Sequence, residues 1–318
     1  MPSNQTPLGA LPARFRRQRV LIVGCGDVGL RTAGQLGAPK SQRVRLLALT
    51  SSPERVRLLR ACGITPLQGN LDDAASLKRL AGMAHRVIHL APPPTDRRGA
   101  SEQDPRSLAL VRALRLRTPP QALVYGSTTG VYGDCGGRRV DETRPVNPHT
   151  PRAQRRVDAE NRMRLWGRSG VRVSVLRIPG IYASDREGGT PRERLLKGTP
   201  VLVAKEDVYT NHIHADDLAR ACAAALWRGK PQRVVNVTDD TDLKMGDYFD
   251  LAAALYGLPK PPRIARSDAN TALPLMLLSF MNESRRLDNT RMKRELRLRL
   301  RYPHVRDGLS PQAALFGD

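Results

Sequence analysis

The sequence predicts an α/β fold in which helices cover both faces of a parallel, doubly wound sheet. Short apolar runs, which are typical of buried parallel strands, alternate along the chain with longer segments whose apolar residues recur at helical spacing. A glycine-rich turn also joins the first apolar run to the first helical segment. At 318 residues, the chain is long enough for one large α/β unit or two smaller ones.

The first half of the chain predicts four strands with helices between them. Ser52 is expected to cap the second helix, with Pro53 in the first helical turn, because both residue types favour these positions. The expected strands span residues 20–23, 44–49, 64–67 and 87–90, and the first expected helix spans residues 27–36.

The second half continues this alternation. A helix around residues 108–116 precedes a strand at 122–125, which is followed by a long polar helix at 152–166 and by strands at 171–178 and 234–237. Loops rich in glycine and proline follow the fourth, fifth and sixth strands. Since doubly wound sheets bind ligands at the carboxyl ends of their strands, we expect the site among these loops. They span residues 92–99, 133–151 and 183–191.

We expect residues 19–318 to form a single unit and residues 1–18 to form a flexible tail. A small C-terminal lobe is expected from about residues 181–210 and 241–318, because the segment between them returns to the sheet. The ligand would then lie between this lobe and the sheet.

The chain is strongly basic, with a formal net charge of +23 and a pI near 11.0. Such a charge favours contact with polyanions. However, most of the 53 basic residues are arginines spread along the chain, which is more typical of codon bias than of a selected surface. The densest stretch, residues 285–306, contains Leu287, Met292, Leu296 and Leu298, which predict an anchored helix. Without zinc-ligand spacing or alternating aromatic and basic residues, nucleic acid is not favoured as a partner.

Cysteine usage and hydropathy favour a cytoplasmic protein. Four cysteines lie far apart in the sequence, so we expect free thiols in a reducing compartment and no metal site. The longest apolar segment, residues 272–281, is too short to cross a bilayer, and the N-terminus lacks the apolar stretch of a secretory signal. We therefore expect no membrane partner. The cysteines are Cys25, Cys62, Cys135 and Cys222.

The glycine-rich turn has the spacing that lets a backbone wrap a dinucleotide pyrophosphate. Gly24 permits the tight turn, Gly26 lets the main chain approach the phosphates, and Gly29 lets the next helix pack closely on the sheet. That helix begins around Asp27 and Val28, and its free N–H groups favour negative charge. The turn therefore predicts binding of NAD or NADP, the alternative being a plain strand-to-helix turn.

Several further segments occur in a recognisable order. Together they resemble the extended branch of the short-chain dehydrogenase/reductase superfamily, the NAD-dependent epimerase/dehydratase type, over about residues 19–315. The resemblance implies a Rossmann fold, oxidoreductase or epimerase activity, and a small-molecule substrate, for which an anionic compound is one option. It also implies either a monomer or a homodimer. The segments span residues 69–72, 89–92, 124–133, 140–142, 176–182 and 213–219.

The resemblance implies roles for individual side chains. Asp72 would contact the adenine, the segment Leu90, Ala91 and Pro92 would border the two riboses, and Ser127 would polarise the reacting oxygen. Structural alternatives stand beside these roles. Asp72 would instead cap a helix before residues 74–80, and Ser127 with Thr128 would satisfy backbone groups at a strand end.

Two other residue groups have structural alternatives that the sequence favours or leaves open. His214 and Asp216 more readily form a turn and a helix cap than a catalytic pair. Tyr182 fits the core as well as it fits a site.

The end of the second strand favours NADP over NAD. An NAD site uses a carboxylate there to hold the ribose hydroxyls, whereas this chain has Ser51 and, shortly afterwards, Arg55. An arginine can hold a 2′-phosphate through two charge-assisted hydrogen bonds, and a serine can add a hydroxyl. The alternative is a merely solvated Arg55, with NAD as the cofactor.

The chain departs from the family where the family's proton chemistry lies. The helix after the fifth strand usually carries a tyrosine and, four residues later, a lysine, but these positions hold Arg152 and Arg156. Arginine does not exchange protons near neutral pH, although it can anchor an anion or stabilise an oxyanion. Tyr132 is our candidate replacement acid, because we expect neighbouring arginines to depress its pKa. The alternative is that Tyr132 only shapes the pocket.

Two functional hypotheses follow. In the first, the chain is an NADP-dependent oxidoreductase or epimerase whose proton donor comes from elsewhere in the site. In the second, the protein binds the dinucleotide without turning it over and acts as a catalytically inactive sensor or regulatory protein.

Overall fold

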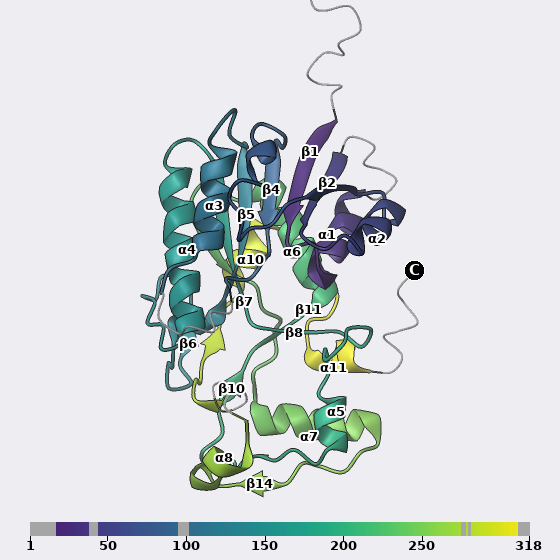
Figure 1. The fold of residues 1–318 in the computed structure, drawn as a ribbon. Helices are drawn as coiled ribbons and strands as arrows, with labels where there is room; N and C mark the ends of the chain where they lie inside the picture. Colours follow the sequence, from purple (N-terminus) through teal and green to yellow (C-terminus); the bar gives the residue numbers. More distant parts are fainter. Residues whose placement is uncertain (1–16, 38–43, 95–101, 275–277, 279–280, 311–318) are drawn as a thin grey trace, which may run out of the picture.

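The computed structural model describes residues 17–37, 44–94, 102–274, 278 and 281–310. Its centre is a seven-stranded parallel sheet with the strand order β12-β7-β5-β4-β1-β2-β3 (Figure 1), which confirms the predicted α/β fold class. Several expected features lie outside the described residues: the tail at 1–16, residues 95–99 of one loop, and parts of the apolar segment 272–281. The strands are β1 (Gln18–Val23), β2 (Val44–Thr50), β3 (Thr65–Gln68), β4 (Arg86–His89), β5 (Ala122–Thr128), β7 (Arg172–Ile178) and β12 (Arg233–Asn236).

The strand order changes direction at β1, and this creates the crevice in which such sheets bind ligands. β2 and β3 extend the sheet on one side of β1, whereas β4, β5, β7 and β12 extend it on the other. Val23 at the end of β1 lies in register with both Leu49 of β2 and His89 of β4. Loops that leave these ends toward opposite faces therefore border a common opening.

Helices cover both faces of the sheet (Figure 1). α1 (Asp27–Gly37) and α6 (Ala215–Arg228) lie on one face, and α3 (Pro105–Leu114) and α4 (Pro151–Gly167) lie on the other. Successive side chains of β1 enter opposite cores: Ile22 packs in the cluster with Leu36 of α1, and Leu21 packs in the cluster with Leu110 of α3. This division follows from the alternation of side chains along a strand.

Local sequence explains where α3 and α4 begin. The Asp104 carboxylate accepts hydrogen bonds from the N–H groups of Arg106 (3.0 Å) and Ser107 (3.3 Å). Thr150 Oγ1 accepts one from the N–H of Ala153 at 3.2 Å. In both helices a proline occupies the first turn, where its missing N–H leaves no bond unmade.

Two capping predictions are wrong. Ser52 does not cap a helix, because α2 (Arg55–Ala61) begins only after a turn and its N-cap position is Glu54, with no side-chain capping hydrogen bond. Asp72 is not a helix N-cap either. The segment after it forms turns and a single 3₁₀ turn at Lys78–Leu80, and the carboxylate of Asp73 accepts the local backbone hydrogen bond instead.

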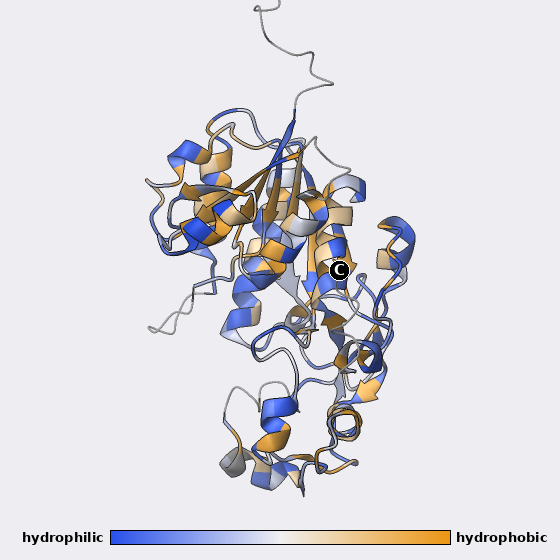
Figure 2. Ribbon diagram, turned by 90° about the vertical axis from the view of Figure 1, so that its right-hand side faces the viewer, coloured by the Kyte–Doolittle hydropathy of each residue, from blue (hydrophilic) through white to orange (hydrophobic). Residues whose placement is uncertain are grey.

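A separate hydrophobic cluster lies beneath the sheet in the view of Figure 1. It joins α5 (Arg192–Leu196), α7 (Met245–Tyr256), α8 (Arg266–Ala272) and α11 (Val305–Leu309) around Phe249, and it contains Tyr182, Leu202, Leu273 and Val305. In Figure 2, the central strands are largely hydrophobic, whereas the helices mix hydrophobic and hydrophilic positions.

One segment of the expected lobe packs against the sheet instead. α10 (Thr290–Glu295) carries Met292, which is fully buried in the core cluster of β1 and α6, and Leu296 follows it there. The basic stretch at 285–306 is thus anchored by apolar residues as predicted, but its helix spans only six residues.

The remaining elements are short and lie in the connections. The 3₁₀ turn Thr129–Tyr132 follows β5 directly. The paired short strands are β6 (Arg139–Val140) with β15 (Arg286–Leu287), β8 (Gly180–Tyr182) with β11 (His212–His214), β9 (Val201–Leu202) with β14 (Arg263–Ile264), and β10 (Tyr209–Thr210) with β13 (Leu243–Lys244).

The four cysteines are free thiols, three of them buried and Cys62 exposed. Within the described ranges, no helix combines the length and the apolar character needed to cross a membrane.

Candidate functional site

A cavity of about 460 Å³ lies over the carboxyl ends of β1, β2 and β4. Its walls come from four stretches of the chain and from several single side chains. These are residues 23–29, 49–52, 69–71 and 90–92, together with the side chains of Arg55, Leu59, Arg106, Ile181 and Arg186. We call this cavity the cofactor groove.

Three glycines shape the floor of the cofactor groove. Gly24 has φ +83°, and a Cβ on it would lie 2.3 Å from the backbone nitrogen of Ala91, so both the turn and the approach of β4 require glycine. A Cβ on Gly29 would lie 3.0 Å from the carbonyl oxygen of Gly24 and 3.4 Å from Ile22 Cγ2 of β1, so α1 packs closely against the sheet at this position. At Gly26 an added Cβ meets no atom within 4 Å, so this position faces open space where a ligand fits.

The charged lining of the cofactor groove is mainly basic. Arg55, Arg106 and Arg186 face it together with a single carboxylate, Asp27. Arg55 is not simply solvated, because its Nη2 donates to the carbonyl oxygen of Cys25 at 2.7 Å. This bond holds the guanidinium beside the glycine turn, in the groove that Ser51 also lines.

Arg186 is a groove residue that the sequence did not reveal. It lies in the loop after β8, where its Nη1 donates to the carbonyl oxygen of Ile181 at 3.2 Å and its Nε lies 3.4 Å from Asp27 Oδ2. The glycine- and proline-rich composition of residues 183–191 indicated a site loop, but nothing in it singled out one arginine. The guanidinium therefore faces the start of α1 from the side opposite the sheet.

The same loop is tied to the glycine-turn region by a second arginine. Arg31 of α1 donates to Asp27 at 2.9 Å, to Asp185 at 2.7 Å and to Asp216 at 2.6 Å. One guanidinium thus joins α1, the loop after β8 and the start of α6.

Asp72 reaches the cofactor groove only through a partner. Its two carboxylate oxygens accept from Arg106 at 2.7 and 2.5 Å, and this pairing lowers the pKa of Asp72. Arg106 lines the groove and also donates to the carbonyl oxygen of Pro92 at 3.2 Å, whereas Asp72 itself is not a lining residue. Leu90, Ala91 and Pro92 form the neighbouring wall.

A buried network lies at the end of β5. Ser127 Oγ donates to Glu160 Oε1 at 2.5 Å, and Arg177 of β7 donates to both carboxylate oxygens of Glu160, at 3.2 and 2.8 Å. All three residues are at most 4 % exposed. The Ser127 hydroxyl therefore donates to a buried carboxylate and not to a backbone group.

Arg152 and Arg156, which the sequence predicts in place of the family's tyrosine and lysine, both lie on α4. Arg152 is exposed near the start of α4. Arg156 is buried and donates from Nη1 to Tyr125 Oη at 3.1 Å and to the carbonyl oxygen of Gly126 at 2.7 Å. Burial, reinforced by Arg156, lowers the pKa of His89 to about 3, so this ring is neutral at pH 7.

The expectation for Tyr132 is corrected by the structure. Its side chain is fully buried, and its hydroxyl donates to Asn236 Oδ1 at 2.8 Å. Burial raises the pKa of Tyr132 despite the guanidinium of Arg177, which stacks 4.6 Å from the ring centroid. The 3₁₀ turn after β5 carries Tyr132 into the core, so it is not placed as a proton donor.

The structural alternatives hold for three other residues. Thr128 Oγ1 accepts from the N–H of Gly130 at 3.4 Å, and His214 Nδ1 accepts from the N–H of Asp216 at 3.2 Å at the start of α6. Tyr182 is buried in the lower hydrophobic cluster, and its hydroxyl donates to the carbonyl oxygen of His304 at 3.3 Å.

Comparison with known proteins places these features in context. A model of the NAD-dependent epimerase/dehydratase family matches residues 20–238. A putative UDP-glucose 4-epimerase of Methanocaldococcus jannaschii is 24% identical over 163 residues, which are 45% of this chain and 52% of that protein. A dTDP-glucose 4,6-dehydratase of Mycolicibacterium smegmatis is 27% identical over 197 residues, 57% of this chain and 55% of that protein. The chain thus spans about half the length of these curated relatives.

Among solved structures, a functionally unknown conserved protein from Silicibacter pomeroyi DSS is similar over nearly the whole chain. It is 30% identical, with a TM-score of 0.76, and the alignment covers 95% of this chain and 100% of that one.

Proposed function

Because the chain belongs to the NAD-dependent epimerase/dehydratase family, we propose that it binds a nicotinamide dinucleotide in the cofactor groove and acts as an oxidoreductase or epimerase. The observation that carries the proposal is the space beside Gly26, where the main chain lies open at the start of α1. Backbone N–H groups at a helix start favour the negative charge of a pyrophosphate. Arg186 would meet the same phosphates from the opposite wall.

The lining of the cofactor groove supports NADP as the dinucleotide. No carboxylate stands at the end of β2 among the residues that line the groove, whereas Ser51 and Arg55 do. The hydrogen bond from Arg55 to the backbone of Cys25 restrains the guanidinium before any ligand arrives. A restrained guanidinium loses less freedom on binding a 2′-phosphate, which strengthens the interaction.

Proton exchange would run through Ser127 and Glu160. When bound, the nicotinamide ring supplies the hydride acceptor. In an oxidation, Ser127 Oγ would accept the proton of a substrate hydroxyl while its own proton passes along the existing hydrogen bond to Glu160 Oε1. The substrate carbon loses a hydride and its oxygen loses a proton, so the step is balanced. In the reverse direction, the proton returns from Glu160 through Ser127.

The substrate that we propose is a small anionic molecule of the sugar-nucleotide class. UDP-glucose and dTDP-glucose appear in the names of the curated relatives. The basic lining of this region would tolerate their phosphates, and the exposed Arg152 near the end of β5 could meet an anionic group.

Calorimetric titration tests the binding proposal. We expect NADPH to bind about tenfold more tightly than NADH, because one charge-assisted phosphate contact contributes roughly 1.4 kcal/mol or more. Arg55→Gln should abolish this preference, whereas Arg57→Gln, which removes an exposed arginine from the same helix, should keep it. Binding of neither coenzyme would overturn the proposal, and equal binding of both would overturn its NADP part.

Turnover is tested with UDP-glucose and dTDP-glucose by following both the absorbance of the reduced coenzyme and the sugar product, because an epimerisation returns the hydride and leaves no net change in the coenzyme. We expect conversion of the sugar nucleotide that Ser127→Ala abolishes while coenzyme affinity stays unchanged. Full turnover in Ser127→Ala would exclude the proton path through this residue.

A second candidate function is dinucleotide binding without turnover. The two arginines at the family's catalytic positions and the burial of Tyr132 favour it. The three ion pairs of Arg31 would then carry the binding signal to the loop after β8. NADPH should protect residues 183–191 from proteolysis while no sugar-nucleotide probe consumes it.

A further inference from the structure

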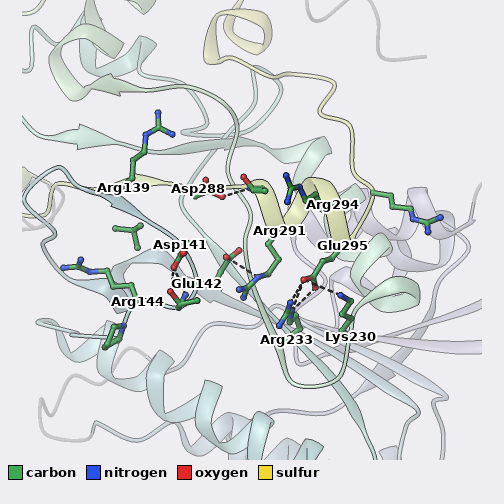
Figure 3. Close-up of a pocket in the computed structure, with 15 residues that line it drawn as sticks. Arg139, Asp141, Glu142, Arg144, Lys230, Arg233, Asp288, Arg291, Arg294 and Glu295 are labelled. Atoms are coloured by element: carbon green, nitrogen blue, oxygen red, sulfur yellow. Dashed lines mark hydrogen bonds and ion pairs between the residues drawn. The ribbon is translucent and has the colours of Figure 1, made fainter.

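A second cavity, of about 1190 Å³, lies along the edge of the sheet formed by β12 (Figure 3). It shares no lining residue with the cofactor groove. Its walls come from β6 and the loop after it, from the start of β12, and from α10 with the residues around it. We call this cavity the basic groove. It is lined by residues 139–145 and by Lys230, Arg233, Asp288, Thr290, Arg291, Arg294, Glu295 and Arg297.

The acidic side chains of the basic groove already have partners. Glu295 pairs with Arg233 and lies 3.6 Å from Lys230. Glu142 accepts from the N–H of Asn236 at 2.8 Å and lies 3.4 Å from Arg291. Figure 3 shows these pairs as dashed contacts in the middle of the groove.

The other two carboxylates are engaged locally. Asp141 Oδ1 accepts from the N–H of Thr143 at 2.8 Å, and Asp288 Oδ1 accepts from the N–H of Thr290 at 2.8 Å. All four acids are therefore engaged within the protein.

Three guanidinium groups of the basic groove remain without a partner. In the part of the chain that the structure describes, the side chains of Arg144, Arg294 and Arg297 make no hydrogen bond or ion pair. Arg144 is half-buried, and the other two are exposed. Seven basic and four acidic residues line the groove, so the surplus positive charge lies on these unpaired groups around it.

The residues on either side of Arg297 hold it at the basic groove. Leu296 and Leu298 on either side are almost fully buried, and Arg297 itself has φ +51°, which is uncommon for a residue with a side chain. Because the two leucines fix the chain in the core, the guanidinium between them faces away from it.

The lining indicates the class of ligand. Eleven of the fifteen lining residues are charged, and only Val140 and Pro145 are apolar. No aromatic side chain lines the groove, so it lacks the aromatic platforms on which bases stack. Guanidinium groups bind phosphate oxygens through paired, charge-assisted hydrogen bonds. We propose that the basic groove binds an oligophosphate chain, recognised through its phosphates alone.

Calorimetry with inorganic tripolyphosphate on the full chain tests this proposal. The triple variant R144Q/R294Q/R297Q should bind tripolyphosphate at least tenfold more weakly than the unmodified protein. R112Q/R164Q/R168Q removes the same charge from exposed positions on or next to α3 and α4 and should bind it unchanged. Equal losses in the two triple variants, or no loss in the first, would overturn the proposal, because attraction would then follow net charge.

Further ligands distinguish the source of the phosphates. ATP should bind as tightly as tripolyphosphate if the nucleoside contributes nothing, and orthophosphate should bind much more weakly. Duplex DNA that binds far more tightly than tripolyphosphate, and is lost only in the groove variant, would replace the proposed ligand class.

Two controls make the outcome independent of the cofactor. The groove variant should keep its NADPH affinity and its circular dichroism spectrum, since the three arginines do not line the cofactor groove and their side chains make no hydrogen bond or ion pair among the described residues. Loss of NADPH binding together with tripolyphosphate binding would contradict the separation of the two sites.

Discussion

The ends of β1 and β5 lie at the same edge of the parallel sheet, but they are built from different kinds of groups. At the end of β1, the site consists of main chain and glycines, and Gly24 is required by the approach of Ala91. At the end of β5, the site consists of the buried polar side chains of Ser127, Glu160 and Arg177. The first region is defined by backbone shape, whereas the second depends on which groups carry charge.

The difference explains which functional part varies from the family's pattern. A backbone that wraps a pyrophosphate needs mainly glycines and a helix start, so it depends little on which side chains surround it. Proton exchange needs particular side chains, and our sequence prediction is that Arg152 and Arg156 of α4 replace the tyrosine and lysine of the family pattern. Glu160 of the same helix accepts a hydrogen bond from the guanidinium of Arg177 of β7 at 2.8 Å.

The largest effect is expected from Glu160→Gln, which leaves the buried guanidinium of Arg177 without its counter-charge. We expect a loss of roughly 3–5 kcal/mol in the free energy of unfolding, measured by urea denaturation. As a control, Asp185→Asn removes one partner of Arg31, but Asp185 is 66% exposed. That change should cost less than about 1 kcal/mol, because water screens the pair. A similar small loss for both variants would show that the network at β5 is not held by charge.

In the glycine turn, Gly24→Ala and Gly26→Ala are expected to separate folding from binding. Gly24→Ala should cost roughly 2–4 kcal/mol of stability, because its Cβ would collide with the backbone of Ala91 at a left-handed φ. Gly26→Ala meets no protein atom and should leave stability unchanged, yet it should weaken NADPH binding about tenfold or more. Thermal unfolding and calorimetry measure the two quantities. Unchanged NADPH affinity in Gly26→Ala would place the coenzyme elsewhere.

The contrast between the backbone turn at β1 and the side-chain network at β5 also separates what could be predicted from the sequence from what could not. The strands, the long helices and the glycine turn follow from apolar periodicity and glycine spacing, which are local properties. The Ser127–Glu160 bond joins residues 33 positions apart on a strand and a helix, and no local pattern records it. Glu160 was visible only as part of a polar helix.

Tyr132 shows how a short sequence separation misleads. It lies five residues beyond Ser127, but the intervening 3₁₀ turn sends it into the core toward Asn236. Arg186 was missed for the opposite reason, because its loop is distant in sequence from the glycine turn and only the tertiary fold brings them together.

Acidification is expected to lower the stability of the folded protein through His89, which ends β4 and packs against Tyr125 of β5. The pKa of His89 is about 3 in the folded protein, below the ordinary value of 6.5, because burial and then Arg156 disfavour the charged ring. A lowered pKa stabilises the folded state above pH 6.5, and this contribution is lost as the pH falls toward 3. Between about pH 6.5 and 4.5, it should amount to roughly 2–3 kcal/mol.

Urea denaturation at several pH values, compared between the unmodified protein and His89→Gln, measures this contribution. The variant should be less stable at pH 7 but should lose less stability on acidification. His212, whose pKa burial also lowers to about 3, is present in both proteins and cancels in the comparison. Parallel curves for the two proteins would mean that His89 accepts its proton in the folded state without cost.

The smallest effect is expected from Arg186→Gln. It sharpens the comparison because it tests whether one side chain contributes to a site made mainly of backbone. Among the described residues, the guanidinium of Arg186 makes polar contacts with the carbonyl oxygen of Ile181 and the carboxylate of Asp27. Because the side chain is also partly exposed, stability should be unchanged. Loss of one charge-assisted contact should weaken coenzyme binding about fivefold. NADH and NADPH should be affected equally, since both carry the pyrophosphate, whereas Arg55→Gln should affect NADPH alone.

Arg192→Gln removes an exposed charge at the start of α5 and should leave both affinities unchanged. If Arg192→Gln weakens binding as much as Arg186→Gln, the effect is general attraction by a basic protein, and the glycine turn holds the phosphates without help from the loop.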